Sequence, residues 1–170
     1  MKFNTKTIHG GQKPEATTGA IMPPVFMTST YAHSRPGEPQ EYEYSRGENP
    51  TRTALENSFA AIENGTHGFA FSSGMAAIDC VLRTLKPGDE VIAGDDLYGG
   101  TYRMFTGLFE KYGLEFTYVD MDDVSNVTHV ITEKTKLVWI ETSTSLLMKI
   151  ADIKAICCAV KGVNDTVLIA

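Results

Sequence analysis

Residues 67–93 read HGFAFSSGMAAIDCVLRTLKPGDEVIA, and they carry the pattern of a β-α-β unit. The short apolar run 67–71 predicts a strand, and a turn of small residues then leads into apolar positions at helical spacing over 73–85. Lys86-Pro87-Gly88-Asp89 is a turn signal, and residues 90–93 predict the next strand. Because a helix between two consecutive strands favours parallel pairing, this stretch indicates an α/β fold.

The same alternation of strands and helices continues to residue 170. Further strands are predicted at 114–119, 136–140 and 166–170. The other helices predicted from apolar spacing are 51–64, 98–112, 122–131 and 151–160. The pattern therefore predicts a mainly parallel sheet. Since α/β proteins bind ligands at the carboxyl edge of the sheet, the informative residues are expected just after each strand.

The first 50 residues differ from the rest of the chain. They hold six of the seven prolines and show no sustained helical period. We interpret residues 1–50 as an extended arm that becomes ordered by lying on another surface. The alternative, which composition alone favours, is a floppy tail.

The composition is that of an ordinary globular protein. The 170 residues carry a net charge of −6, with 42% hydrophobic and 21% charged residues. This excludes intrinsic disorder, collagen and a disulfide-stapled miniprotein. No stretch approaches the ~20 apolar residues of a membrane span, and the N-terminus lacks the apolar core of a secretory signal. The acidic balance, without a basic run, argues against a nucleic-acid surface.

The three cysteines, Cys80, Cys157 and Cys158, are an odd number, and none stands in a metal-ligand spacing. This pattern favours a reducing cytoplasm as the location of the protein. It predicts that the thiols are buried apolar filler, and it predicts no metal site.

The turn after the first predicted strand is a candidate anion site. Ser72-Ser73-Gly74-Met75 places small residues at a strand-to-helix turn, where backbone N–H groups and the helix dipole attract an anion. The motif is neither G-x-G-x-x-G nor a Walker loop, so neither a dinucleotide nor a nucleoside triphosphate is indicated. The alternative is a plain serine cap with a glycine for packing.

Two further segments carry candidate ligand contacts. Tyr98 stands at a predicted helix start among glycines, where its ring is able to stack on a flat ligand; the alternative is a tyrosine that packs on its neighbour. In the arm, Tyr44 and Arg46 are two residues apart and point the same way if the segment is extended, which suits joint contact with one phosphate. The alternative there is a solvated charged loop.

Four co-linear motifs resemble one known family. They are Tyr44-Ser45-Arg46 with Asn49-Pro50-Thr51-Arg52, Ser72-Ser73-Gly74-Met75-Ala76-Ala77-Ile78, Asp95-Asp96-Leu97-Tyr98-Gly99-Gly100-Thr101, and Trp139-Ile140-Glu141-Thr142 with Lys149-Ile150-Ala151-Asp152-Ile153. In this order and spacing they resemble the pyridoxal-phosphate enzymes of cysteine and methionine metabolism. That family includes cystathionine γ-lyase, cystathionine γ-synthase, cystathionine β-lyase, methionine γ-lyase and the homoserine sulfhydrylases. The resemblance covers essentially the whole chain.

The resemblance implies a fold and a reaction. Residues 1–50 would be an arm that contacts another subunit, and residues 51–170 an incomplete cofactor-binding domain of the fold-type I, aspartate aminotransferase-like class. The implied activity is that of a lyase or transferase of the transsulfuration type, acting on C–S bonds of small sulfur amino acids such as cystathionine. The implied cofactor is pyridoxal 5'-phosphate.

The resemblance also implies roles for individual residues. The backbone amides of Gly74 and Met75, with Ser73, would hold the cofactor phosphate, while Tyr98 would stack on the pyridine ring and assist proton transfer. Tyr44 and Arg46 would reach the phosphate of a neighbouring subunit. Such a site exists only in a dimer, and the family usually forms a homotetramer from two dimers.

The sequence also departs from the family pattern. Where the family has Pro-Thr-Asn-Pro, this chain has Ser143-Thr144-Ser145-Leu146, so Ser145 takes the place of an Asn that contacts the ring hydroxyl. None of the ten lysines matches the Schiff-base Lys of the family. We therefore expect a truncated chain that is inactive by itself. The alternative is a non-catalytic remnant or interaction module that retains part of the phosphate site.

Overall fold

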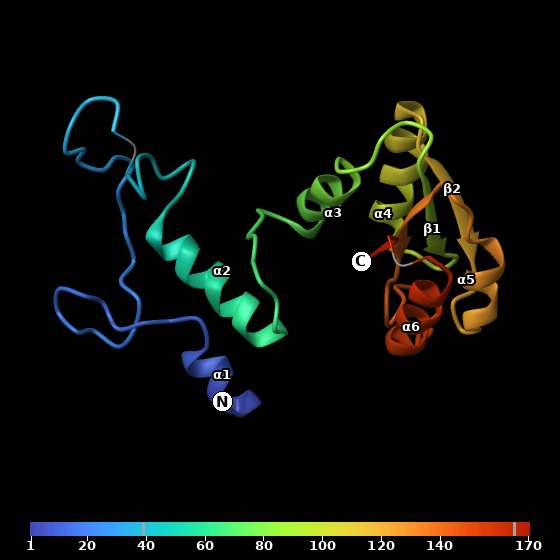
Figure 1. Cartoon of the computed structure of the whole chain (residues 1–170), viewed down its shortest axis with the longest axis horizontal. Coiled ribbons are helices and arrows are strands. Elements are labelled where there is room, and N and C mark those ends of the chain that lie inside the picture. Colours follow the sequence, from blue (N-terminus) through green and yellow to red (C-terminus); the bar gives the residue numbers. More distant parts are fainter. Residues whose placement is uncertain (39, 165) are drawn as a thin grey trace. The chain divides into compact units, whose positions relative to one another are not determined.

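The chain divides into two units, residues 1–72 and 73–170, in the computed structural model (Figure 1). The structure describes residues 1–38, 40–164 and 166–170. The predicted division of the chain at residue 50 stays a prediction. The contacts within the chain group the helix that follows residue 50 with the arm rather than with the sheet. In the part of the chain that is described, no helix is both long and apolar enough to cross a membrane.

The second unit is built on a parallel sheet. Its strands are β1 (Glu90–Gly94), β2 (Glu115–Val119), β3 (Thr135–Trp139) and β4 (Leu168–Ile169). They lie in the order β2-β1-β3-β4, and every neighbouring pair is parallel. The prediction of an α/β fold with a mainly parallel sheet is confirmed.

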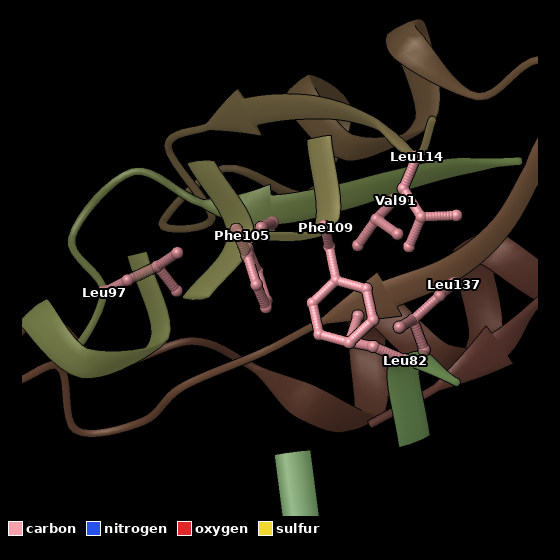
Figure 2. Close-up of a cluster of buried hydrophobic side chains, with 8 residues drawn as sticks. Leu82, Val91, Leu97, Phe105, Phe109, Leu114 and Leu137 are labelled. Carbon is pink, nitrogen blue, oxygen red and sulfur yellow. The ribbon is translucent and has the colours of Figure 1, made fainter. Parts of the chain in front are cut away.

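One face of the sheet is covered by α3 (Gly74–Leu82) and by the segment that starts with α4 (Gly99–Met104). This segment continues as the π-helical η1 (Phe105–Phe109) and the 3-10 turn η2 (Glu110–Tyr112). The core on this face consists of Leu82, Val91, Ala93, Leu97, Phe105, Phe109, Leu114 and Leu137 (Figure 2). Because side chains of a strand alternate between faces, β1 sends Val91 and Ala93 to this core and Ile92 to the other.

The opposite face carries α5 (Val124–Val130) and α6 (Ile153–Val163), which contact each other. Its core consists of Ile92, Met121, Val127, Val138, Ala151, Ile156, Val160 and Val167. The expectation that the cysteines are buried filler is wrong for two of them. Cys80 and Cys158 are exposed, because they lie on helix faces that point away from these cores.

In the first unit, α2 (Pro50–Glu63) is the element on which the rest of the unit lies. Asn49 caps it, since the Asn49 side chain accepts a hydrogen bond of 2.8 Å from the Thr51 N–H. Gly11 and Gly68 pass directly against its backbone; a Cβ on Gly11 would stand 2.0 Å from the Asn57 carbonyl oxygen. Glycine is therefore required at both positions.

Two expectations for this unit are wrong. Residues Phe3–His9 form a helix, α1, which packs on α2, although the sequence showed no helical period there. Residues 67–71 form no strand, and Phe69 and Phe71 are exposed. A strand needs a hydrogen-bonding neighbour, and among the described residues none pairs with 67–71.

Candidate active site

The loops that follow β1 and β3 meet at the carboxyl edge of the sheet. The chain leaves β1 at Gly94 and runs through Asp95 and Asp96 to the start of α4 at Gly99. It leaves β3 at Trp139 and reaches Glu141 two residues later. Since parallel neighbours end at the same edge, the two loops contact each other although about 40 residues separate them in sequence.

The N-terminus of α3 presents unpaired backbone donors. Ser73 caps the helix, and its Oγ accepts a hydrogen bond of 3.2 Å from the Ala76 N–H. The N–H groups of Gly74 and Met75 have no acceptor among the described residues. No atom lies within 4 Å of the position that a Cβ on Gly74 would occupy, so the space beside these donors is open.

Met75 and Tyr98 come together over Gly100. A Cβ on Gly100 would stand 2.9 Å from the Met75 sulfur and 2.4 Å from the Tyr98 ring, so only glycine leaves room for both side chains. The Tyr98 side chain remains 51% exposed. The closeness of both side chains to Gly100 places the N-terminal end of α3 near the segment that carries Tyr98, at the carboxyl edge of β1.

Glu141 anchors the Tyr98 loop from the neighbouring strand. Its carboxylate accepts hydrogen bonds from the Tyr98 N–H at 2.6 Å and from the Thr101 hydroxyl at 2.7 Å. Trp139 Nε1–H donates to the same carboxylate at 3.2 Å. Glu141 is a residue at this edge for which the sequence predicted no role. The available signal was its position, a charged residue just past a strand at the ligand-binding edge.

Ser145 lies on an exposed turn that is tied to the other loops of this edge. The Leu147 N–H donates to the Asp96 carboxylate at 2.9 Å, and Lys149 Nζ forms ion pairs with Asp95 at 3.1 Å and with Asp120 at 3.2 Å. Hydrogen bonds to these two carboxylates raise the pKa of Lys149 above its usual value. The turn with Ser145 is therefore held at the same edge as Tyr98, on the side of Asp95 and Asp96.

Tyr44 and Arg46 lie together in the first unit, but not on an extended segment. The N–H groups of Gly47 and Glu48 both donate to the Tyr44 carbonyl, so residues 44–48 form a turn. The turn places the Arg46 guanidinium 4.9 Å from the centroid of the Tyr44 ring. The expected extended geometry of this pair is therefore wrong, since a turn brings the two side chains together instead. Contact of this pair with a phosphate in another subunit stays a prediction.

The second-unit residues suit a ligand with a phosphate and a flat ring, as in pyridoxal phosphate. Free N–H groups at the start of a helix bind an anion through hydrogen bonds and the helix dipole. An exposed aromatic ring beside them offers a stacking surface. The open space at Gly74 and the exposed ring of Tyr98 leave both features accessible.

The known proteins that resemble this chain carry related enzyme names. The chain is 48% identical to a cystathionine beta-lyase of Coxiella burnetii over 91% of its length, and 48% identical to a probable cystathionine gamma-synthase of Herpetosiphon aurantiacus, also over 91%. It spans 40% and 48% of the length of these two relatives.

A solved structure agrees with these relatives. The crystal structure of cystathionine gamma-lyase from Lactobacillus plantarum, complexed with L-serine, matches 99% of this chain and 44% of that one, with a TM-score of 0.91 and 43% identity. The α/β fold with its parallel sheet is that of the N-terminal portion of the fold-type I enzymes. A family model described as "Cys/Met metabolism PLP-dependent enzyme" matches residues 4–170. The chain therefore belongs to the pyridoxal-phosphate-dependent enzymes of cysteine and methionine metabolism.

Proposed function

We propose that this chain supplies the phosphate- and ring-binding part of an enzyme that cleaves or forms C–S bonds in sulfur amino acids such as cystathionine. The observation that carries the proposal is that Met75, at the start of α3 with its free N–H groups, and the Tyr98 ring both lie close to Gly100. The named relatives act as lyases and synthases of cystathionine, which supports the same substrate class here.

In this proposal each residue has a defined task. The N–H groups of Gly74 and Met75 bind the phosphate dianion, and Ser73 keeps the first turn of α3 in place for them. The ring of Tyr98 stacks on the pyridine ring, and its hydroxyl holds or passes a proton at the substrate. Ser145 contacts the ring hydroxyl. Pyridoxal phosphate, when bound, supplies an electron sink for charge that develops next to the amino group of the substrate.

The proposal includes a second copy of the chain. Tyr44 and Arg46 would contribute to the phosphate site of that copy, because a guanidinium is able to donate two parallel hydrogen bonds to a phosphate. The three cysteines are unpaired, and we propose the reducing cytoplasm as the location.

A second candidate function is a non-catalytic protein that binds a phosphate-bearing ligand. It is favoured by the stretch Ser143–Leu146, where a serine on an exposed turn replaces the amide of the family pattern. In this case the anion site and Tyr98 would bind the ligand without bond cleavage.

The experiment measures binding and reaction on the same preparation. The chain is titrated with pyridoxal phosphate in a calorimeter and then assayed for pyruvate or oxobutyrate release from cystathionine. Binding that Tyr98→Ala weakens supports the site, with Tyr112→Ala as the control, because Tyr112 is 61% exposed and lies outside the contacts described above. Because the chain is expected to be inactive by itself, the assay is repeated after the chain is joined to the C-terminal part of a cystathionine lyase relative that carries the missing lysine. Turnover in either preparation supports the first function, and binding without turnover in both supports the second. No binding would contradict both.

A further inference from the structure

The carboxylate of Glu141 accepts hydrogen bonds from three donors. These are the Tyr98 N–H, the Thr101 hydroxyl and Trp139 Nε1–H, at 2.6, 2.7 and 3.2 Å. Thr101 is fully buried, and its hydroxyl has this one partner among the described residues. Hydrogen bonds to an ionised acceptor are the stronger kind, so the arrangement holds the loop firmly.

The start of α4 has no side-chain cap of its own. Tyr98 occupies the N-cap position of α4, where Ser, Thr, Asp or Asn would accept from the first turn, but a tyrosine side chain makes no such bond. Glu141 takes over this task from the end of β3. The backbone of Tyr98 is therefore fixed by a residue 43 positions further along the chain.

The backbone position decides where the ring lies. The Tyr98 ring lies close over Gly100, and a Cβ on Gly100 would stand 2.4 Å from the ring and 2.9 Å from the Met75 sulfur. A shift of the Tyr98 N–H away from Glu141 would move the ring off Gly100 and away from the open end of α3.

We propose that Glu141 is a positioning residue that holds the Tyr98 ring in register with the phosphate-binding end of α3. The inference rests on the proposed function in one respect, namely that Tyr98 contacts the cofactor ring. If Glu141 only linked β3 to α4, it would stabilise the chain without affecting ligand binding through Tyr98. The two roles differ in whether the effects of Glu141 and Tyr98 on affinity are coupled.

A double-mutant cycle measures this coupling. Calorimetry gives the affinity for deoxypyridoxine phosphate, an analogue without the aldehyde, for the unmodified chain, Glu141→Gln, Tyr98→Ala and the double variant. The Glu141→Gln change would turn an amide N–H₂ toward N–H and O–H donors, so the loop shifts. We expect it to weaken binding by about two- to tenfold, at most the loss from removing a stacked ring. The double variant should bind as Tyr98→Ala does, whereas multiplied losses would overturn the proposal.

A control and a fallback variant keep the result specific. Glu133→Gln makes the same chemical change on the exposed turn before β3, where the carboxylate has no hydrogen bond among the described residues, and it should bind the analogue as the unmodified chain does. If Glu141→Gln does not fold, Thr101→Val removes one of the three donors and enters the same cycle. Thr101→Val should weaken binding of the analogue less than Glu141→Gln does. When Tyr98→Ala is already present, Thr101→Val should weaken binding no further.

Two measurements without ligand separate this inference from the proposed function. In Glu141→Gln the Tyr98 amide should exchange its hydrogen at least about tenfold faster, while the β1 amides stay protected. Trp139 is the single tryptophan, and its emission should shift when its charged acceptor is lost. Unchanged exchange and emission overturn the inference. If both change but the unmodified chain does not bind the analogue, the positioning stands and the proposed function fails.

Discussion

Gly74 stands where a side chain would enter open space rather than protein. No atom lies within 4 Å of a Cβ placed there, and its backbone does not adopt the left-handed conformation that favours glycine. A β-branched residue is therefore free of backbone strain at this position. The effect of a substitution should fall on the ligand and not on the fold.

We predict that Gly74→Val weakens binding of pyridoxal phosphate by about tenfold or more, because the isopropyl group occupies the space beside the N–H groups that face the anion. Stability should change by no more than about 0.5–1 kcal/mol. Calorimetry and urea unfolding measure the two quantities. Gly107→Val is the matched control, since a Cβ on Gly107 also meets no atom within 4 Å. Equal binding by both variants would contradict the prediction.

The ring and the hydroxyl of Tyr98 are separable. Tyr98→Phe keeps the stacking surface, so affinity for the cofactor should stay within about twofold, whereas Tyr98→Ala should lower it by about two- to tenfold. Titration of both variants with deoxypyridoxine phosphate tests this. If Tyr98→Phe lowers the affinity as much as Tyr98→Ala does, the hydroxyl and not the ring makes the contact with the ligand.

At the scale of elements, Lys149 ties three loops of the sheet edge together. It belongs to the segment after β3 and forms ion pairs with Asp95 after β1 and Asp120 after β2. Backbone and Lys149 hydrogen bonds hold the pKa of Asp120 below its usual value, and the two carboxylates raise that of Lys149. The turn that carries Ser145 depends on this anchor and on the Asp96–Leu147 hydrogen bond.

We predict that Lys149→Met speeds amide exchange across residues 143–148 while β1 and β3 stay protected. Because the pKa of Asp120 is lowered, its ion pair with Lys149 holds the turn at any pH above the usual carboxylate range. This stabilisation is lost only as the pH falls through the lowered pKa. Because the pKa of Lys149 is raised, the stabilisation of the turn by its ion pairs is lost only as the pH rises through the raised pKa. Protection of the turn in the unmodified chain should therefore be constant from pH 5 to 9, roughly. Loss of protection within that window would refute the assignment.

At the scale of the whole molecule, the first unit lacks a core of its own. All buried apolar residues of the described chain lie at Leu82 or later, while Ile8, Ile21, Met27 and Phe69 of the first unit are exposed. Exposed apolar side chains of this kind mark a surface that another surface covers. We propose a second copy of the chain as that surface, in keeping with the expected role of Tyr44 and Arg46.

We predict that deletion of residues 1–46 lowers cofactor affinity and shifts the chain toward monomers at the same time, because one segment serves both. Arg46→Ala alone should cost about ten- to a hundredfold in cofactor affinity, since it removes a charge-assisted contact. Sedimentation velocity and calorimetry measure the two effects. Arg35→Ala is the control, because Arg35 is an exposed arginine of the same arm. A monomeric chain that binds the cofactor as tightly as the dimer would refute the in-trans role.

Most helices and strands of the second unit, and the order of the candidate site residues along the chain, were predictable from the sequence alone. Strands predicted at 90–93, 114–119 and 136–140 are observed at Glu90–Gly94, Glu115–Val119 and Thr135–Trp139. The helix expected at 51–64 is observed at Pro50–Glu63. These features depend on apolar periodicity and on caps such as Asn49 and Ser73, which involve residues close in sequence. The resemblance to the family was likewise recognised from the order and spacing of motifs along the chain.

Which of these elements pair, and which distant residues contact each other, depends on the three-dimensional fold. The segment 67–71 lacks a partner strand among the described residues, and the predicted helix 98–112 breaks into α-, π- and 3-10-helical turns where Phe105 and Phe109 enter the core. The anchoring of Tyr98 by Glu141 joins residues 43 positions apart. A strand, or a hydrogen bond between distant loops, forms only where a partner residue lies opposite. The linear sequence does not identify that partner, because the folding of the sheet brings the two loops together.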